Sequence, residues 1–388
     1  MGMFLLCTFL MIILYPLGID LYLVAVPRIA QTLQGSEAQI HTAFSIYLLG
    51  MAATVLPGGM LADRHGRRPV VLGGALIFVV ASLVAAEATG IAQFYLGRFW
   101  QGVGAGALYI MTFTVLRDVL SQARLAMALS LINGVICVIP VLAPVLGYLI
   151  LSHFEWRGIF VGMALVAAIS ALVNLRLLKE TRPARQPAGA SPLALLGTAP
   201  FMLRALLTSA SVTAILVYVS VSPLVLMTTF DLSPEQYTRL MMAMAGVSMS
   251  ASFLTPLLLR WLGKARVLAL SHLAYLLALL ALLCSSGPEG GLSWLLAGCA
   301  LVCIGFSCGF GVAMGEALDV CGDQVASASA LLCIMQIGLS GLFIWGMGHL
   351  GMPALWMLIL ALLLALLGYL VVKVLLPWRA VRRVRARG

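Results

Sequence analysis

Residues 57–69 read Pro-Gly-Gly-Met-Leu-Ala-Asp-Arg-His-Gly-Arg-Arg-Pro, a short charged turn between two long apolar runs. Four charged residues fall within positions 63–68, whereas only 9% of the whole chain is charged. A turn this short lets its flanking runs lie only as an antiparallel pair of helices. Short loops rich in Lys and Arg stay on the cytoplasmic side of a membrane, so the three arginines predict a cytoplasmic turn. The alternative is a basic loop that fixes topology and does nothing more.

The composition excludes a soluble globular protein. The 388 residues are 62% apolar, with a mean hydropathy of +1.09, whereas soluble domains are about 45–50% apolar and about 25% charged. The net charge of +10 is compatible with nucleic-acid binding, but the distribution of Lys and Arg between apolar runs favours a membrane protein. No cleavable signal is expected, because the first apolar run lacks a basic leader and exceeds signal length.

The eight cysteines lie almost all inside apolar runs, without a CxxC pair and without a histidine at ligand spacing. This pattern predicts neither a metal site nor a disulfide framework. Cys299, Cys303 and Cys308 approach one another on one expected helix. They are interpreted as small packing residues, with a pathway for soft metal ions as the alternative.

Apolar runs predict the fold, because a helix needs about 20 apolar residues to cross a bilayer. Twelve such runs make this an all-α polytopic membrane protein; they are 4–27, 40–61, 70–88, 92–116, 126–151, 158–178, 203–227, 237–259, 266–286, 292–314, 326–348 and 352–376. The predicted domains are a six-helix bundle at 1–178, a linker at 179–202, a second bundle at 203–376 and a basic tail at 377–388.

The distribution of basic residues predicts the orientation. With the N-terminus inside, 19 of the 23 Lys and Arg residues fall in cytoplasmic segments and 3 fall outside, leaving Arg98 within a span. This bias places both termini in the cytoplasm. The acidic turn with Glu316, Asp319 and Asp323 departs from the trend and has no explanation from the sequence. The tail at 379–387 is expected to lie against anionic headgroups.

The two halves repeat with an offset of 196 residues. The charged turn is echoed at 259–266, where the basic residues remain and the aspartate is lost. Ser36 and Ser233 each open a span with glutamine three residues on, a capping-box arrangement. The same offset relates Gly50 to Gly246 and Arg64 to Arg260. Such repeats predict two pseudo-symmetric bundles around a central site that opens alternately to the two sides.

Asp20 is the one acid well inside a predicted span. Inserting a carboxylate there costs about 2.5–3.5 kcal/mol, so an intramembrane acid indicates function. Burial favours the neutral form, which makes Asp20 a candidate for reversible protonation. The alternative is an acid at a helix end that reaches the headgroups.

Arg98 is the one cation inside a predicted span. Counting about 1.5 Å per residue places Asp20 about 24 Å, and Arg98 about 21 Å, above the cytoplasmic edge. The matched heights predict either a buried ion pair or two charges that face one water-filled cavity. Gln101, Tyr109 and Thr112 on the same span are candidates for lining the substrate cavity.

The charged turn resembles the signature loop between the second and third helices of the major facilitator superfamily. Its pattern Gly-x-Leu-Ala-Asp-Arg-x-Gly-Arg-Arg is met at Gly59, Asp63, Arg64, Gly66, Arg67 and Arg68. Residues 98–104 resemble the Arg-x-x-Gln-Gly-x-Gly motif of the fourth helix in the same superfamily. The resemblance implies the twelve-helix major facilitator fold and a gating role for the turn.

Residues 140–147 resemble the antiporter signature of the fifth helix, with Ala143 in place of its first glycine. Pro140 and Pro144 are expected to kink this helix, and Gly147 to allow close packing, so the segment is a candidate hinge. Kinking without directional meaning is the alternative. Further matches at residues 19–27, 156–157, 180–181 and 222–223 make the chain similar to the drug/proton antiporter class.

The resemblance implies a proton-coupled multidrug exporter of small amphipathic compounds in a bacterial inner membrane. Asp20 and Arg98 would couple the proton, with the gradient as the energy source and no cofactor or metal. The expected partners are small amphipathic molecules, protons and the bilayer, and the expected state is a monomer. A dedicated exporter of one sugar or amino acid, and a non-transporting receptor or scaffold, are the alternatives. The lack of HExxH, paired intramembrane acids or a Ser-His constellation argues against an enzyme.

Overall fold

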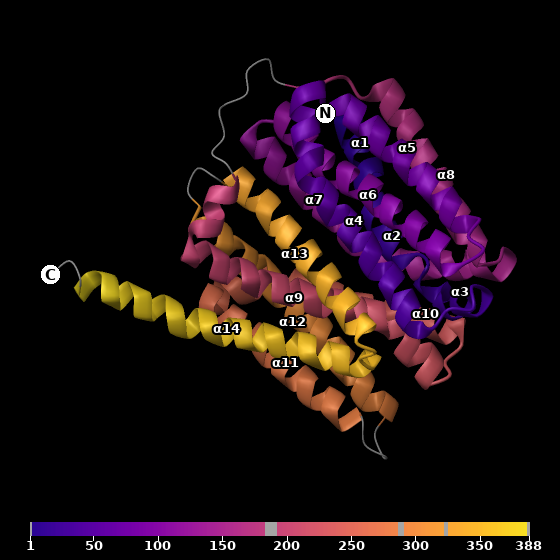
Figure 1. The fold of residues 1–388 in the computed structure, drawn as a ribbon. Coiled ribbons are helices and arrows are strands. Elements are labelled where there is room, and N and C mark those ends of the chain that lie inside the picture. Colours follow the sequence, from indigo (N-terminus) through magenta and orange to yellow (C-terminus); the bar gives the residue numbers. More distant parts are fainter. Residues whose placement is uncertain (1, 183–191, 286–290, 322–324, 386–388) are drawn as a thin grey trace. The chain divides into compact units, whose positions relative to one another are not determined.

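The computed structural model describes residues 2–182, 192–285, 291–321 and 325–385 of the 388 residues, and within these ranges every element is a helix (Figure 1). The first half comprises α1 (Gly2–Ile12), α2 (Leu14–Asp20), η1 (Leu23–Ala25), α3 (Val26–Thr32), α4 (Glu37–His65), α5 (Arg67–Ala86), α6 (Ile91–Val119), α7 (Gln122–His153) and α8 (Trp156–Leu177). The second comprises η2 (Pro192–Gly197), α9 (Ala199–Pro223), η3 (Leu224–Thr229), α10 (Pro234–Leu262), α11 (Lys264–Ser285), α12 (Gly291–Asp319), α13 (Val325–His349) and α14 (Ala354–Arg385).

The predicted polytopic fold is confirmed. Among the described residues, eleven helical stretches are long and apolar enough to cross a membrane. The remaining predicted span, 126–151, lies within α7, whose described apolar stretch is Val138–His153. Large apolar side chains such as Leu76 and Phe253 are 62% and 76% exposed, as expected where lipid rather than water covers a surface.

The first span is not the continuous helix that the sequence predicts over 4–27. It is divided into α1, α2, the 3₁₀ turn η1 and α3. Pro16 and Gly18 weaken regular helix within α2, and Pro27 lies in the first turn of α3. As a result α2 ends at Asp20, and the carbonyls of its last turn need partners from outside the helix.

One compact unit comprises Met1–Pro187, Val219–Ala245 and Gly341–Met352. Within it, α6 packs against α4 and α5, and α5 packs against α8. Segments of the second half also belong to this unit, since η3 contacts α3 and Gly341 of α13 lies against Leu48 and Leu49 of α4. In the predicted orientation these segments are the external ends of their helices. The predicted division at residues 178 and 203 follows the sequence repeat, and it remains a prediction.

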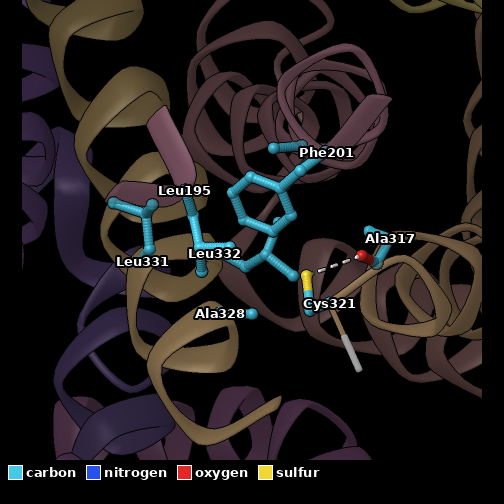
Figure 2. Close-up of a cluster of buried hydrophobic side chains, with 8 residues drawn as sticks. Leu195, Phe201, Ala317, Cys321, Ala328, Leu331 and Leu332 are labelled. Atoms are coloured by element: carbon cyan, nitrogen blue, oxygen red, sulfur yellow. Dashed lines mark hydrogen bonds between the residues drawn. The ribbon is translucent and has the colours of Figure 1, made fainter. Parts of the chain in front are cut away.

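The second compact unit comprises Ala188–Tyr218, Gly246–Ser340 and Pro353–Gly388. Within it, α11 packs against α12 and α14. A buried apolar cluster fastens the end of the predicted linker, in η2, to helices of this unit (Figure 2). Its members are Leu195, Phe201, Ala205, Ala317, Cys321, Ala328, Leu331 and Leu332, and the Cys321 thiol donates to the Ala317 carbonyl at 3.4 Å.

Candidate functional site

Asp20, at the C-terminal end of α2, is 7% exposed. It is within electrostatic range of three buried tyrosines: Tyr22 just after α2, Tyr47 of α4 and Tyr237 of α10. The Tyr47 hydroxyl donates to the Tyr15 carbonyl at 3.0 Å, so α4 is tied to α2 beside the acid. The carboxyl group is therefore buried within electrostatic range of three tyrosine hydroxyls.

Arg98 of α6 is completely buried, and it contacts the same region. Its Nη2 donates to the Gly18 carbonyl at 2.9 Å, one of the carbonyls in the last turn of α2. Its guanidinium carbon lies 4.4 Å from the ring centre of Tyr22 and 4.5 Å from that of Tyr47. Aromatic faces attract a desolvated cation, so backbone and rings together stabilise a charge that would otherwise be costly to bury.

Gln101, one turn after Arg98, fixes the orientation of the guanidinium. Its Oε1 accepts from Arg98 Nη1. Its Nε2 donates to Ser82 Oγ of α5 at 2.8 Å and lies 3.3 Å from Met163 Sδ of α8. Gln101, which the sequence predicts to line the cavity, is completely buried and links α6 to α5 and α8.

Arg98 contacts Gly18, which is two residues from Asp20 in the sequence. The two charged residues therefore lie at similar levels, as helix counting predicts. They do not form the direct pair that was one of the two predicted arrangements. No ion pair joins Arg98 to Asp20 in the described part of the chain. The guanidinium binds a backbone carbonyl, an amide oxygen and two aromatic faces instead, which leaves the carboxyl group without a direct counter-ion.

Tyr109 and Thr112, the other candidates for the cavity, lie further along α6. Tyr109 meets Tyr15 edge-on at 5.3 Å and Phe113 at 5.0 Å between ring centres. Thr112 is completely buried and donates to the Leu108 carbonyl at 2.9 Å. Tyr109 therefore belongs to an aromatic group that reaches α2, whereas Thr112 satisfies its hydroxyl within its own helix.

The candidate hinge lies in α7, which continues through Pro140 and Pro144. Gly147 faces η1 so closely that a Cβ atom there would collide with the Leu21 carbonyl oxygen. A side chain at this position would push α7 away from the break that follows Asp20. Gly147 is therefore required for the close approach of α7 to the broken first span.

The charged turn forms a second, separate constellation around Arg67, whose side chain is 5% exposed. Its Nη1 donates to Asp63 Oδ1 at 2.8 Å and to the Ala62 carbonyl at 2.9 Å. Its Nε donates to Asp118 Oδ2, near the end of α6, at 2.8 Å. Asp118 is 9% exposed, so this pair is nearly desolvated and joins α5 to α6.

Glu180, just beyond α8, caps the N-terminal end of α5. Its carboxylate accepts from the backbone N–H of Arg67 at 2.8 Å and of Arg68 at 3.2 Å. It also accepts from the N–H groups of Thr181 and Arg182 at 3.0 and 2.9 Å. Partial burial acts to raise the pKa of Glu180, but the hydrogen bonds from Arg67, Arg182, Arg68 and Thr181 outweigh it and hold the pKa below its usual value.

Gly66 makes this cap possible. Its φ of +103° and ψ of 163° lie in a region that is essentially restricted to glycine, and a Cβ atom would collide with the Glu180 carboxylate. Arg182 and Arg68 donate to the carbonyls of Arg64 and Leu175, at 2.8 and 2.6 Å. The beginning of the predicted linker is therefore bound directly to the charged turn.

Sequence reasoning missed Asp118, Glu180 and the tyrosines around Asp20 as members of these sites. For the two acids a signal exists, since each lies within two residues of an arginine at a predicted cytoplasmic helix end. Of the predicted turn residues, Gly59 lies apart from the hydrogen-bonded group, with nothing within 4 Å of a Cβ built on it.

The family model of the Major Facilitator Superfamily matches residues 8–344. The chain belongs to the major facilitator superfamily. Among known relatives, it is 45% identical to "Multidrug resistance protein MdtL" of Klebsiella pneumoniae (strain 342) over 364 residues, covering 92% of each chain. It is 43% identical to the protein of the same name from Escherichia coli O81 (strain ED1a) over 369 residues, covering 94% and 93% of the two chains.

Solved structures of the superfamily share the fold. The nucleoside transporter NupG (D323A mutant) matches with a TM-score of 0.75 at 16% identity, covering 97% of this chain and 99% of its own. A D-xylose–proton symporter matches with a TM-score of 0.75 at 13% identity, covering 96% and 97%. This major facilitator chain is thus a transporter with the fold that the sequence predicted.

Proposed function

We propose that this protein is a proton-coupled antiporter that exports small amphipathic compounds across a bacterial inner membrane. The observation that carries the proposal is the buried arrangement of Arg98, Gly18 and Asp20 at the break in the first span. The relatives named as multidrug resistance proteins support the class of substrate. The proton gradient supplies the energy, no cofactor takes part, and the monomer is the working unit.

Coupling requires a group that is protonated in one conformation and bare in the other, because a ligand shifts an equilibrium only through its different affinities for the two states. Asp20 is that group. Arg98 binds the backbone of Gly18, so a movement of α2 that breaks this hydrogen bond changes the distance between the guanidinium and the carboxyl group. An Asp20 that approaches Arg98 loses its proton, and one that is held among the tyrosines keeps it.

The test is drug-induced proton release from the purified, detergent-solubilised protein. We expect Asp20→Asn to abolish the release while substrate binding persists, since the amide keeps the shape of the carboxyl group and cannot titrate. Arg98→Lys should restore part of the coupling that Arg98→Ala loses, because the charge remains although the planar fork is lost. Full proton release from Asp20→Asn would place the coupling proton elsewhere and overturn the proposal.

The charged turn latches the cytoplasmic ends of the helices in one state of the cycle, with both termini in the cytoplasm. Asp63 is half-exposed and binds Arg67, whereas Asp118 binds the same guanidinium from a nearly buried position. We expect Asp63→Asn to reduce transport by at least about tenfold, which corresponds to about 1.4 kcal/mol in the conformational equilibrium, while membrane abundance stays near normal. Uptake into inverted vesicles and quantitative immunoblotting measure the two quantities; undiminished transport, or degradation of the variant, would contradict the latch.

A further inference from the structure

A buried histidine in the second unit has no part in the site described above. His272 of α11 is 3% exposed. In the register that pairs Arg67, the first residue of α5, with Lys264, the first residue of α11, its counterpart in the first half is Ala75, which is buried and apolar. The repeat therefore does not require a polar group here, and the imidazole needs an explanation of its own.

The hydrogen bonding of His272 fixes its tautomer. Nδ1 lies 2.8 Å from the Leu268 carbonyl oxygen, which can only accept, so Nδ1 carries the ring proton. Nε2 therefore presents a lone pair. That atom is buried and has no hydrogen-bond partner among the described residues. Buried polar atoms are nearly always satisfied, so an unpaired acceptor of this kind points to something that binds there.

Two aromatic rings contact the imidazole of His272. The imidazole stacks on Tyr369 of α14, with 4.2 Å between ring centres and 18° between planes, and meets Tyr275 of its own helix edge-on at 5.6 Å. An aromatic face stabilises an imidazolium as it does any desolvated cation. Histidine is also the side chain whose charge most readily changes near neutral pH, and histidines inside spans mark proton sites.

Charged groups reach this stack from α12 and α14, two of the helices that pack against α11. Lys373 of α14 is within electrostatic range of His272, and its Nζ lies 5.6 Å from the centre of the Tyr369 ring. Glu316 of α12 acts electrostatically on Tyr369. Lys264 and Asp319, at the ends of α11 and α12, form an exposed pair at 3.1 Å. Of the acidic turn that the sequence leaves unexplained, Asp319 thus pairs with Lys264 and Glu316 lies within electrostatic range of Tyr369, whereas Asp323 lies outside the described residues.

We propose that His272 is a second proton-binding site: Nε2 accepts a proton from the cytoplasmic side, and the resulting imidazolium is held against the face of Tyr369. His272 lies eight residues into α11, about 12 Å from its first residue, Lys264. The proposal goes beyond the function argued above and needs it only for the direction from which the proton arrives. It adds a titrating group to the half of the chain that has no acid inside a predicted span.

The test uses the full-length protein in lipid nanodiscs, with ¹³C-labelled histidine and NMR detection between pH 5 and 9. The chain has five histidines, and His272→Phe assigns the signal of interest by its disappearance. We expect that signal to titrate between about pH 5 and 8. A signal that stays constant over the whole range overturns the proposal.

Three further variants still test the proposal if His272→Phe does not fold. Lys373→Gln removes a like charge and should move the titration midpoint towards higher pH. Tyr369→Leu removes the stacked ring and should move it towards lower pH, whereas Tyr369→Phe should leave it in place. A signal that responds to none of these changes belongs to another histidine or shows that the stack plays no part, and either result overturns the proposal.

A matched control is His349→Phe, because His349 also stacks on an aromatic ring, Trp345, but is exposed. It should remove a different signal and leave the midpoint of His272 unchanged. The variant Asp20→Asn should also leave that midpoint unchanged. Since no transport is measured, failure of this proposal and failure of the antiporter proposal give different results.

Discussion

The charged turns of the two halves have the same backbone plan. Gly66 precedes α5 with a φ of +103°, and Gly263 precedes α11 with a φ of +78°. Each following helix begins with a cation, Arg67 or Lys264, that pairs with an acid at the end of the next helix. Those pairs are Arg67–Asp118 at 2.8 Å and Lys264–Asp319 at 3.1 Å.

The two turns differ in what surrounds the pair. The side chains of Arg67 and Asp118 are 5% and 9% exposed, whereas those of Lys264 and Asp319 are 64% and 65% exposed. The first turn also contains Asp63 and is capped by Glu180, while a Cβ built on Gly263 meets nothing within 4 Å. The repeat thus preserves a helical hairpin in both described turns but builds a desolvated charge network in only one of them, and the latch proposed above rests on that network.

The largest effect expected from this comparison concerns the two cations. Arg67→Ala leaves Asp118 nearly buried without its partner, and breaking a buried pair from one side costs about 3–5 kcal/mol. Lys264→Ala breaks a pair in water, which is worth about 0–1 kcal/mol. Thermal unfolding in detergent should therefore show a large loss of stability for Arg67→Ala and almost none for Lys264→Ala. Equal losses would mean that burial does not distinguish the two turns.

A smaller effect is expected at the glycines. Alanine at either position places a non-glycine residue at positive φ, which costs about 1–3 kcal/mol. Gly66→Ala must also displace the Glu180 carboxylate, so it should release the linker and reduce transport as well as stability. Gly263→Ala has open space and should cost stability alone. Unfolding and vesicle uptake measured on both variants test this, and a transport defect in Gly263→Ala as large as that of Gly66→Ala would count against a special role for the first turn.

Much of this comparison was accessible from sequence, and the limits have physical causes. Apolar runs, basic loops and the 196-residue offset predicted the helices and both turns. The reason is that apolar length and the distribution of Lys and Arg determine which segments cross the membrane and in which direction. Burial of the Arg67 pair could not be predicted, since it depends on the approach of α6 and α8 from distant positions in the chain. Counting residues predicted the level of Arg98 but not its partner, because a straight first helix was assumed and the break beyond Asp20 offers a carbonyl instead.

The smallest effect expected concerns the Glu180 cap, and pH should reveal it. Glu180→Gln can still accept hydrogen bonds but loses the charge. Hydrogen bonds to charged groups contribute about 1.5–3 kcal/mol, against about 0.5–1.5 for neutral ones, and the exposed position reduces the difference to below about 1 kcal/mol. As a control, Glu235→Gln removes the exposed pair with Arg239 and should cost about 0.3–0.5 kcal/mol.

The sign of the pH dependence follows from the lowered pKa of Glu180. The folded protein holds the carboxylate more strongly than the unfolded chain does, so the stabilisation is complete above the ordinary glutamate pKa of about 4.3. It is lost as the pH falls through the lower value of the folded state, where the native carboxylate also takes up a proton. The unfolding temperatures of wild type and Glu180→Gln should thus differ at pH 7 and converge in acid. If the difference in unfolding temperature widened on acidification, the folded protein would favour the protonated form of Glu180. That result would contradict stabilisation of the carboxylate by the four backbone N–H groups.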